Sequence, residues 1–177
     1  MNLILDAREK RSQDIISKWR GNPLLIIKTN VPGPDKNPFW SKFLLLHFYN
    51  LISSKFSIIR ASFEESIDGD YWLMELKEED ALKNKLIVIE EDHPLGRLID
   101  LDLYLNPKKS ISRSEMGLRK RKCLLCDQDA LICNRMQVHS LSELLNKQEE
   151  VICNYLKKLI IPLIDEAITL EADLDPK

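Results

Sequence analysis

The segment 98–105 constrains the fold more than any other, because acidic and apolar residues alternate along it with a period of two. Such alternation predicts a β-strand whose successive side chains point to opposite faces of a sheet. Asp100 and Asp102 then share one face, while Ile99, Leu101 and Leu103 share the other. Neighbouring carboxylates repel each other unless a cation lies between them, and Mg²⁺ is commonly bound by one or two carboxylates plus substrate phosphates. An amphipathic strand with a solvated polar face has the same pattern.

The remaining periodicities predict an α+β fold in which neighbouring strands pair antiparallel. Apolar spacing predicts helices over 3–19, 40–52, 77–83, 124–135 and 141–164, and Pro162 is expected to break or kink the last one. Short apolar runs between turn residues predict strands over 24–27, 56–62, 71–76, 86–89 and 98–105. We expect one domain over 1–177, with an α/β part over 1–122 that carries the acidic strand and a helical part over 123–177.

The charge of the chain is distributed unevenly. A net charge of −2 over 177 residues gives no overall attraction to nucleic acid or membrane. The segment 107–122, however, contains a single acid, Glu115, among basic residues: Lys108, Lys109, Arg113, Arg119, Lys120, Arg121 and Lys122. This basic segment suits a polyanionic substrate, and it is also typical of a solvated loop. No stretch resembles a signal peptide or approaches the ~18 apolar residues of a membrane span, so we expect a cytoplasmic protein.

A cluster of metal-ligand residue types follows the basic segment. Cys123 and Cys126 form a Cys-x-x-Cys pair, the usual first half of a zinc site, and Cys133 and His139 supply two further ligand types. The spacing of this second half is not a standard one. Cys126 and Cys133 also lie seven residues apart, on one face of the predicted helix, where thiols behave as small hydrophobic groups. The residues alone favour buried thiols over zinc, and they place Cys153 in the core.

Several other residues have a functional and a structural interpretation. The Arg97 guanidinium can bind phosphate bidentately or pair with a neighbouring acid. His93 can act in acid–base chemistry or serve as a hydrogen-bonded structural residue. The loop 31–36, with Pro32-Gly33-Pro34 and Lys36, can offer an ammonium to phosphate or be an ordinary turn. No Walker-type glycine loop, Gly-x-Ser-x-Gly elbow or Rossmann fingerprint is present.

Motifs spread along nearly the whole chain resemble those of one known family. They are Arg8 and Arg11, Pro32-Gly33-Pro34-x-Lys36, His93-Pro94-Leu95-Gly96-Arg97-Leu98-x-Asp100-x-Asp102, Ser112-Arg113, Arg121-x-Cys123-Leu124-Leu125-Cys126, Ala130, Cys133, Arg135 and His139. In these motifs the chain resembles the apo-citrate lyase phosphoribosyl-dephospho-CoA transferases, the holo-acyl-carrier-protein synthases of citrate lyase. One departure is Asp68-Gly69-Asp70, where the family often has a glycine-proline-glutamate stretch.

The resemblance implies a nucleotidyltransferase-like fold, with a mixed or antiparallel sheet and flanking helices, and a transfer reaction. The donor would be 2′-(5″-triphosphoribosyl)-3′-dephospho-CoA, the acceptor a serine of the citrate lyase acyl carrier (gamma) subunit, and the leaving group diphosphate. Asp100 and Asp102 would hold Mg²⁺, with Glu90 as a candidate third carboxylate, and Arg97 would be catalytic. Substrate binding would fall to Lys36, His93, Gly96, Arg113 and Arg121. Neither nucleic acid nor membrane is an expected partner.

Two alternatives remain open. A related transferase can modify the carrier protein of malonate decarboxylase by similar chemistry, and nothing in this chain identifies the acceptor. A non-catalytic module can instead use a Cys/His zinc site and the basic segment to bind nucleic acid or an acidic partner. Nucleic-acid surfaces interleave aromatic and basic residues, and the stretch 108–122 contains no aromatic residue, which argues against nucleic acid.

Overall fold

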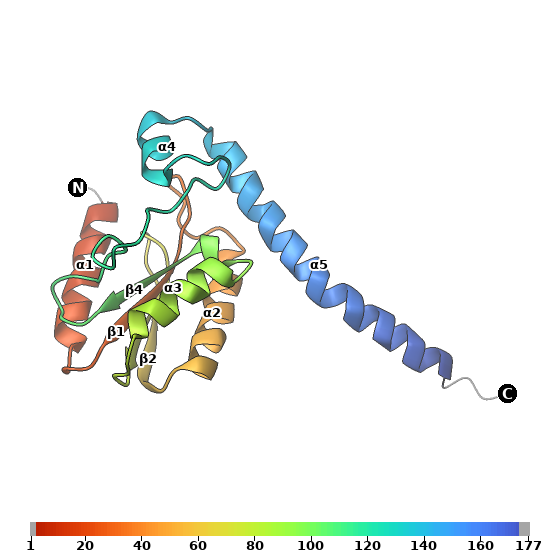
Figure 1. The fold of residues 1–177 in the computed structure, drawn as a ribbon, viewed down its shortest axis with the longest axis horizontal. Helices are drawn as coiled ribbons and strands as arrows, with labels where there is room; N and C mark the ends of the chain where they lie inside the picture. Colours follow the sequence, from red (N-terminus) through yellow and green to blue (C-terminus); the bar gives the residue numbers. More distant parts are fainter. Residues whose placement is uncertain (1–2, 174–177) are drawn as a thin grey trace.

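The computed structural model describes the backbone of residues 3–173 and the side chains of residues 3–162 (Figure 1). Its elements follow in the order α1 (Leu3–Lys18), β1 (Leu24–Thr29), α2 (Ser41–Lys55), β2 (Ile58–Glu64), β3 (Tyr71–Leu76), α3 (Leu82–Asp92), a 3-10 turn (Gly96–Leu98), β4 (Ile99–Tyr104), α4 (Ala130–Met136) and α5 (Leu141–Asp173). The α+β class expected from the sequence is confirmed. The more specific expectation of a nucleotidyltransferase-like fold stays a prediction.

Within these residues, the strands form one four-stranded antiparallel sheet in the order β2-β3-β1-β4. The predicted antiparallel pairing is therefore confirmed, as are four of the five predicted strands. Strand β1 is buried along almost its whole length because it lies between β3 and β4. Its register places Lys28 opposite Asp100 and Ile26 opposite Asp102.

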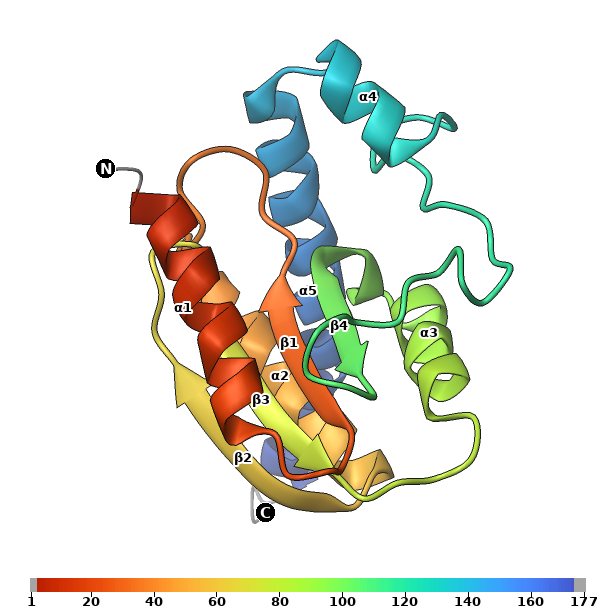
Figure 2. The same cartoon turned by 90° about the vertical axis from the view of Figure 1, so that its left-hand side faces the viewer.

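The two faces of the sheet are covered differently (Figure 2). Helix α1 lies on one face, where Ile15 packs with Ile26 and Tyr71. Helices α2, α3 and the first part of α5 contribute to the larger core on the opposite face, where Phe48 of α2 is fully buried. Burying a side chain of this size contributes roughly 1.5–3 kcal/mol. Because the larger cluster contains most of the buried apolar side chains, this second face holds most of the apolar stabilisation. The face beneath α1 has the smaller apolar cluster, which leaves space for charged groups.

The helix predicted over 77–83 is wrong because residues 77–81 are not helical, and the strand predicted over 86–89 is wrong because it belongs to α3, which begins at Leu82. Leu82, Leu86 and Ile89 recur with helical spacing and all point into the core. A short apolar run does not distinguish a strand from a buried helical turn, and this ambiguity caused the error. The preceding turn ends at Ala81, whose left-handed φ of 56° is incompatible with continuing one helix from 77.

Helix α3 covers the free edge of β4 with polar side chains. The Lys83 ammonium donates to the Leu101 carbonyl at 2.8 Å, and the Glu90 carboxylate accepts from the Leu101 amide at 2.9 Å. Both side chains lie in residues that are more than nine-tenths buried. An edge strand otherwise exposes unpaired backbone groups, so these two bonds fix where β4 lies relative to α3.

The helical part after residue 122 differs from the expectation in three ways. The helix predicted over 124–135 is confirmed only from Ala130, where the Asp129 side chain caps α4 by accepting from the Leu131 amide at 2.8 Å. Pro162 does not break α5, which continues through it to Asp173. Cys153 is exposed rather than in the core, because Ile152 beside it occupies the packed face of α5.

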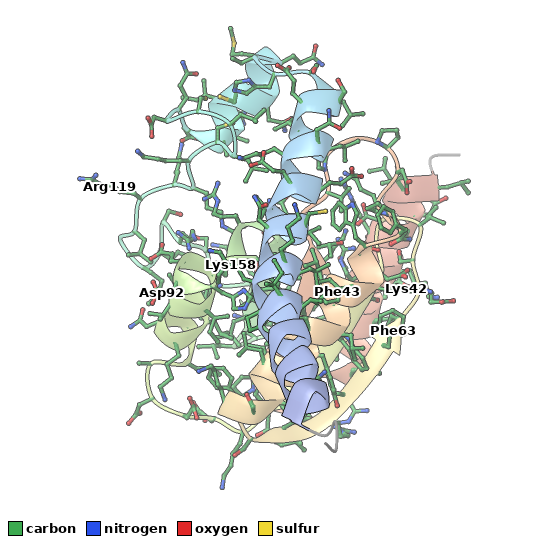
Figure 3. The ribbon with its side chains drawn as sticks, turned by 90° about the vertical axis from the view of Figure 1, so that its right-hand side faces the viewer. Lys42, Phe43, Phe63, Asp92, Arg119 and Lys158 are labelled. Atoms are coloured by element: carbon green, nitrogen blue, oxygen red, sulfur yellow. The ribbon has the colours of Figure 1, made fainter. Side chains whose placement is uncertain are left out.

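Helix α5 begins with a capping box. The Ser140 amide donates to the Glu143 carboxylate at 2.8 Å, and the Glu143 amide donates back to the Ser140 hydroxyl at 3.2 Å. The helix then crosses the face formed by α2 and α3 (Figure 3) and extends beyond the body (Figure 1). In the part of the chain that the structure describes, no helix has both the length and the apolar character needed to cross a bilayer.

Candidate functional site

The acidic strand β4 has the alternation expected from its sequence. Leu101 and Leu103 are each 1% exposed in the core, whereas Asp100 and Asp102 face the side of the sheet that carries α1. Side chains that are register partners on an antiparallel pair lie about 5 Å apart at Cβ, so Lys28 lies next to Asp100. The two carboxylates are therefore neighbours on one face, beside a lysine from the central strand.

Arg121 of the basic segment joins Asp100 to Glu90. Its guanidinium donates to Asp100 and lies 2.5 Å from Glu90 Oε1. Burial lowers the pKa of Arg121, but the Asp100 and Glu90 carboxylates outweigh this and raise the pKa above its usual value. The other oxygen of Glu90 lies 3.3 Å from Arg113, and Oε1 also accepts from the Leu101 amide. Glu90 thus anchors two arginines, and its assignment as a third metal ligand stays a prediction.

Asp102 has no comparable partner. Among residues 3–162, no lysine or arginine forms an ion pair with it, and the residue is only partly covered by the surrounding protein. The protein atoms packed around it raise the pKa of the Asp102 carboxyl, and the Asp100 carboxylate raises it further. The repulsion expected from the sequence is therefore present in the fold, and a cation bound between the two groups would relieve it.

Asp68 is a functional candidate that the sequence did not identify. Its side chain is 0% exposed and binds three cations: Arg8 Nε at 3.0 Å, Arg11 Nη1 at 2.7 Å and Lys28 Nζ at 2.7 Å. Burial raises the pKa of Asp68, but these hydrogen bonds prevail and lower the pKa to about 2. One buried carboxylate thus holds three cations beside the acidic strand.

The turn that carries Asp68 depends on Gly69. Its φ is +101°, and a Cβ at this position would lie 2.8 Å from Lys28 Cε. Asp70 supports the same turn, because its carboxylate accepts from the Ser66 amide at 3.0 Å. The Asp68-Gly69-Asp70 departure from the family pattern therefore still supplies an acid. The signal in the sequence was the pair Arg8 and Arg11, three residues apart on one helix face and in need of an acidic partner.

We expect Asp68→Asn to lower the free energy of unfolding by about 2 kcal/mol at pH 7, as the shift in pKa from 3.8 to about 2 implies. The folded-state pKa lies below the unfolded-state value. The stabilisation is therefore complete above about pH 4 and is lost as the pH falls through about 2. Urea unfolding of both proteins from pH 7 down to pH 3 measures this difference. The exposed Asp92→Asn variant, which removes the same charge, should have the same free energy of unfolding as the wild type. Equal stability of wild type and Asp68→Asn at pH 7 would contradict a stabilising role of the Asp68 ion pairs.

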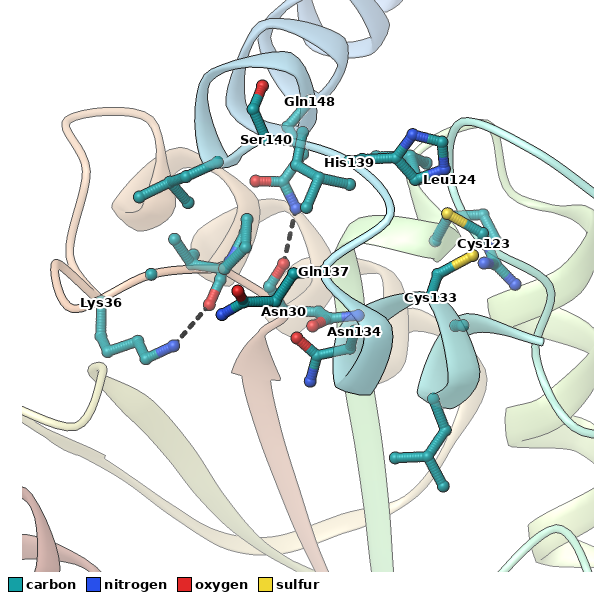
Figure 4. Close-up of a pocket in the computed structure, with 18 residues that line it drawn as sticks. Asn30, Lys36, Cys123, Leu124, Cys133, Asn134, Gln137, His139, Ser140 and Gln148 are labelled. Carbon is teal, nitrogen blue, oxygen red and sulfur yellow. Dashed lines mark hydrogen bonds between the residues drawn. The ribbon is translucent and has the colours of Figure 1, made fainter. Parts of the chain in front are cut away.

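A cavity of about 870 Å³ opens beside the end of β1 (Figure 4). The loop 31–36 forms one wall, and α4 with the start of α5 forms the other. The Lys36 ammonium, which lines the cavity, donates to the Val31 carbonyl at 2.7 Å, and Gln148 of α5 donates to the Asn30 carbonyl at 2.6 Å. Burial lowers the pKa of Lys36. The loop that the sequence offered as a phosphate contact thus lies at a cavity of ligand size.

Arg97 lines both this cavity and a smaller hollow of about 370 Å³ that contains Arg113 and Arg121. Its guanidinium donates to the Lys122 carbonyl. Burial lowers the pKa of Arg97, and the positive charges of Arg121 and Arg113 lower it further. The structure therefore brings together the three predicted phosphate-binding arginines; Arg119 also lines the smaller hollow, but its side chain extends away from the body (Figure 3).

The contacts of His93 and Gly96 are ones that stabilise the fold. The His93 Nε2 atom lies 3.1 Å from His47 Nε2, and its Nδ1 accepts from the Leu95 amide at 3.1 Å. Burial, with a smaller effect of His47, lowers the pKa of His93 to about 4. A Cβ on Gly96 would collide with the Glu90 carbonyl, so this glycine permits the close approach of α3 to the start of β4. The structure does not bring His93 to the carboxylates; its role in substrate binding, like that of Gly96, stays a prediction.

The four predicted metal-ligand residues converge. One ligand atom from each of Cys123, Cys126, Cys133 and His139 lies within 4.8 Å of all the others. The expectation of thiols along one helix face is wrong, because only Cys133 lies in α4 and only Cys133 is buried. These residues can hold a metal ion.

Comparisons with known proteins agree with the motifs. A family model described as CitX, apo-citrate lyase phosphoribosyl-dephospho-CoA transferase, matches residues 1–155. The chain is 33% identical over 174 residues to protein CitXG of Leuconostoc mesenteroides subsp. cremoris, a match that covers 94% of this chain and 37% of that protein. It is 27% identical over 169 residues to a probable apo-citrate lyase phosphoribosyl-dephospho-CoA transferase of Streptococcus pyogenes serotype M18, with 88% and 86% covered.

A third relative, the apo-citrate lyase phosphoribosyl-dephospho-CoA transferase of Escherichia coli O9:H4, is 42% identical over 71 residues. That match covers 40% of this chain and 39% of the relative. The chain thus spans less than two fifths of CitXG, and the similarity to the Streptococcus protein extends over most of both chains.

Proposed function

The chain belongs to the CitX family of apo-citrate lyase phosphoribosyl-dephospho-CoA transferases, and from this we propose that it attaches the prosthetic group of citrate lyase. The donor is 2′-(5″-triphosphoribosyl)-3′-dephospho-CoA, and the acceptor is a serine of the acyl carrier subunit. The serine oxygen bonds to the α-phosphorus, the bond from that phosphorus to its bridging oxygen breaks, and diphosphate leaves. The serine proton passes to a base. The carrier protein gains a phosphodiester-linked group in this nucleotidyltransferase-type reaction.

The observation that carries this proposal is the acidic strand of β4 with cations on both sides. Asp100 and Asp102 share a face, Lys28 lies beside them on β1, and Arg121 pairs with Asp100. A triphosphate carries about four negative charges, and phosphoryl transfer depends on positioning and neutralising that charge. A combination of carboxylates for a metal and cations for phosphate suits this task better than it suits a purely structural sheet face.

The donor set at Asp100 and Asp102 fits Mg²⁺, which takes one or two carboxylates and completes its shell with water and phosphate oxygens. Desolvation, and after it the Asp100 carboxylate, raises the pKa of Asp102, and a cation bound between the two groups would offset both effects. When bound, Mg²⁺ would neutralise charge on the phosphates and on the departing diphosphate. Arg121, which pairs with Asp100 and Glu90 beside these carboxylates, would contact a phosphate of the bound donor.

The remaining cations have roles that follow from their positions. Asp68 holds Arg8, Arg11 and Lys28 in fixed places along the α1 face, so their geometry is set before the donor binds. Arg97 lies between the two hollows, where it can contact the phosphates from the other side. The cavity of about 870 Å³ has the volume to hold part of the dephospho-CoA moiety.

The decisive experiment is intact-protein mass spectrometry of purified citrate lyase carrier subunit, incubated with this protein, the donor and Mg²⁺. We expect a mass gain equal to the donor minus diphosphate, and no gain when the acceptor serine is replaced by alanine. The malonate decarboxylase carrier protein, tested in parallel, separates the two transferase alternatives. Modification of that carrier alone would reassign the acceptor. Binding of either carrier without any mass gain would favour a non-catalytic module.

A further inference from the structure

We propose that Cys123, Cys126, Cys133 and His139 bind one structural Zn²⁺ ion that holds the basic segment in place against the acidic strand. This proposal does not depend on the transferase reaction. It rests on the convergence of four ligand groups from three separate parts of the chain. They come from the turn after the basic segment, from α4, and from the linker before α5.

The distances fit a tetrahedral centre before any ion is added. Cys126 Sγ lies 3.4 Å from Cys133 Sγ and 3.3 Å from His139 Nε2, and all four ligand atoms lie within 4.8 Å. Zinc bonds of about 2.3 Å to sulfur and about 2.0–2.1 Å to nitrogen place tetrahedral ligand atoms roughly 3.5–3.8 Å apart. Shifts of only a few tenths of an ångström would bring the Cys126–Cys133 and Cys126–His139 pairs to these separations.

The alternatives of a disulfide and of buried thiols fit less well. The separation of 3.4 Å between Cys126 and Cys133 is far longer than a disulfide bond, and all the cysteines are free. Cys123 and Cys126 are half-buried, unlike thiols that pack as hydrophobic groups in a core. The Leu125 amide donates to Cys123 Sγ at 3.5 Å, a contact that would stabilise a thiolate. His139 Nε2 lies 3.3 Å from Cys126 Sγ, and a polar imidazole is not typical of a purely apolar cluster.

Local backbone structure gives this region little independent stability. Helix α4 has only seven residues, and isolated helices of this length do not form in water. The turn before it is closed by the Cys123 amide donating to the Gln128 carbonyl at 2.7 Å and the Ala130 amide donating to the Arg121 carbonyl at 2.9 Å. Short metal-bound units of this kind commonly take their folding energy from the ion.

The position of the cluster gives the ion a definite effect on the acidic strand. Arg121, two residues before Cys123, pairs with Asp100 and Glu90, and Arg97 donates to the carbonyl of Lys122. His139 immediately precedes Ser140, which caps α5. One ion would thus fix the basic segment at one end and the start of α5 at the other. Four protein ligands leave no open position, so the ion is structural rather than catalytic.

The test begins with metal analysis of the full chain, purified without a metal-binding tag from zinc-containing medium. We expect about one zinc per chain, and after exchange with Co²⁺ we expect the visible absorption of a tetrahedral thiolate site. Cys126→Ser and Cys133→Ser should each lose most of the metal. Cys153→Ser, which changes an exposed thiol outside the cluster, should keep it. Because a ligand variant can fail to fold, the wild-type metal content and the cobalt spectrum are decisive on their own.

A second readout separates a metal that organises the basic segment from one that is merely bound. Chelation should increase hydrogen exchange at the amides of Cys123, Ala130 and Cys133, while the amides of β1 and β3 stay protected. Zinc below a tenth of an equivalent together with no cobalt spectrum would overturn the proposal. So would iron in place of zinc, retention of zinc by Cys126→Ser, or unchanged exchange after the metal has been removed.

Discussion

Asp100→Asn should reduce transfer to the carrier protein by roughly a thousandfold or more, because a bound metal contributes several kcal/mol to phosphoryl transfer and each 1.36 kcal/mol is a factor of ten. An amide is a poor Mg²⁺ ligand and carries no charge to balance the ion. Asp100 is half-buried on the polar face of β4, next to Lys28 of β1, so the substitution should leave the strand itself in place. The measurement is the initial rate of carrier-protein mass gain at saturating donor.

Asp102→Asn provides the matched variant, and its effect on stability should have the opposite sign. The ion pair between Asp100 and Arg121 stabilises the folded protein, so Asp100→Asn should lower the melting temperature in metal-free buffer. The folded-state pKa of Asp102 is raised, so its ionised form destabilises the folded protein at neutral pH. Asp102→Asn should therefore raise the melting temperature.

Both variants should be inactive in transfer. Loss of activity in a variant that is more stable than wild type cannot come from unfolding. An Asp100→Asn protein that is folded and keeps more than a tenth of the wild-type rate would exclude the metal assignment. Transfer by the wild-type protein that persists unchanged in a chelator would exclude Mg²⁺ while leaving the family reaction intact.

Arg97→Lys should slow transfer by more than tenfold. The substitution keeps the charge and loses the planar fork that binds phosphate bidentately. A charged hydrogen bond is worth about 1.5–3 kcal/mol, which corresponds to a factor of roughly 10–150. Arg97 is also placed by its bond to the Lys122 carbonyl, which a lysine can reach only with a different geometry. We expect the loss to fall mainly on donor binding, measured as a rise in KM for the donor.

Lys108→Ala and Lys109→Ala are the controls for charge in the same segment. Both lysines are exposed, and Lys109 pairs with Glu115 at 2.6 Å, away from the two hollows. These variants should leave donor affinity unchanged. They should weaken recognition of an acidic carrier protein, in a way that fades as salt is raised. A silent Arg97→Lys together with lost donor affinity in the two lysine variants would contradict the assignment.

The sequence by itself determined the acidic strand and the faces of its side chains. The period-two alternation is a local pattern, and the backbone geometry of a strand turns it directly into an arrangement in space. The same reasoning recovered β1, β2 and β3, where short apolar runs lie between turn residues. It failed over 86–89, because four apolar residues fit a strand or a buried helical turn equally well. Only the packing of Leu86 against the core decided between them.

The candidate site itself depended on contacts between residues far apart in the chain. Asp68 lies 60 residues from Arg8 and 40 from Lys28, and no local pattern links an acid to cations at that separation. Likewise, the sequence supplied the types of the Cys and His residues, and the turn before α4 brought their ligand atoms together. Local periodicity fixes which face a side chain occupies, whereas its partner depends on how distant elements pack, and that was decided by the tertiary structure alone.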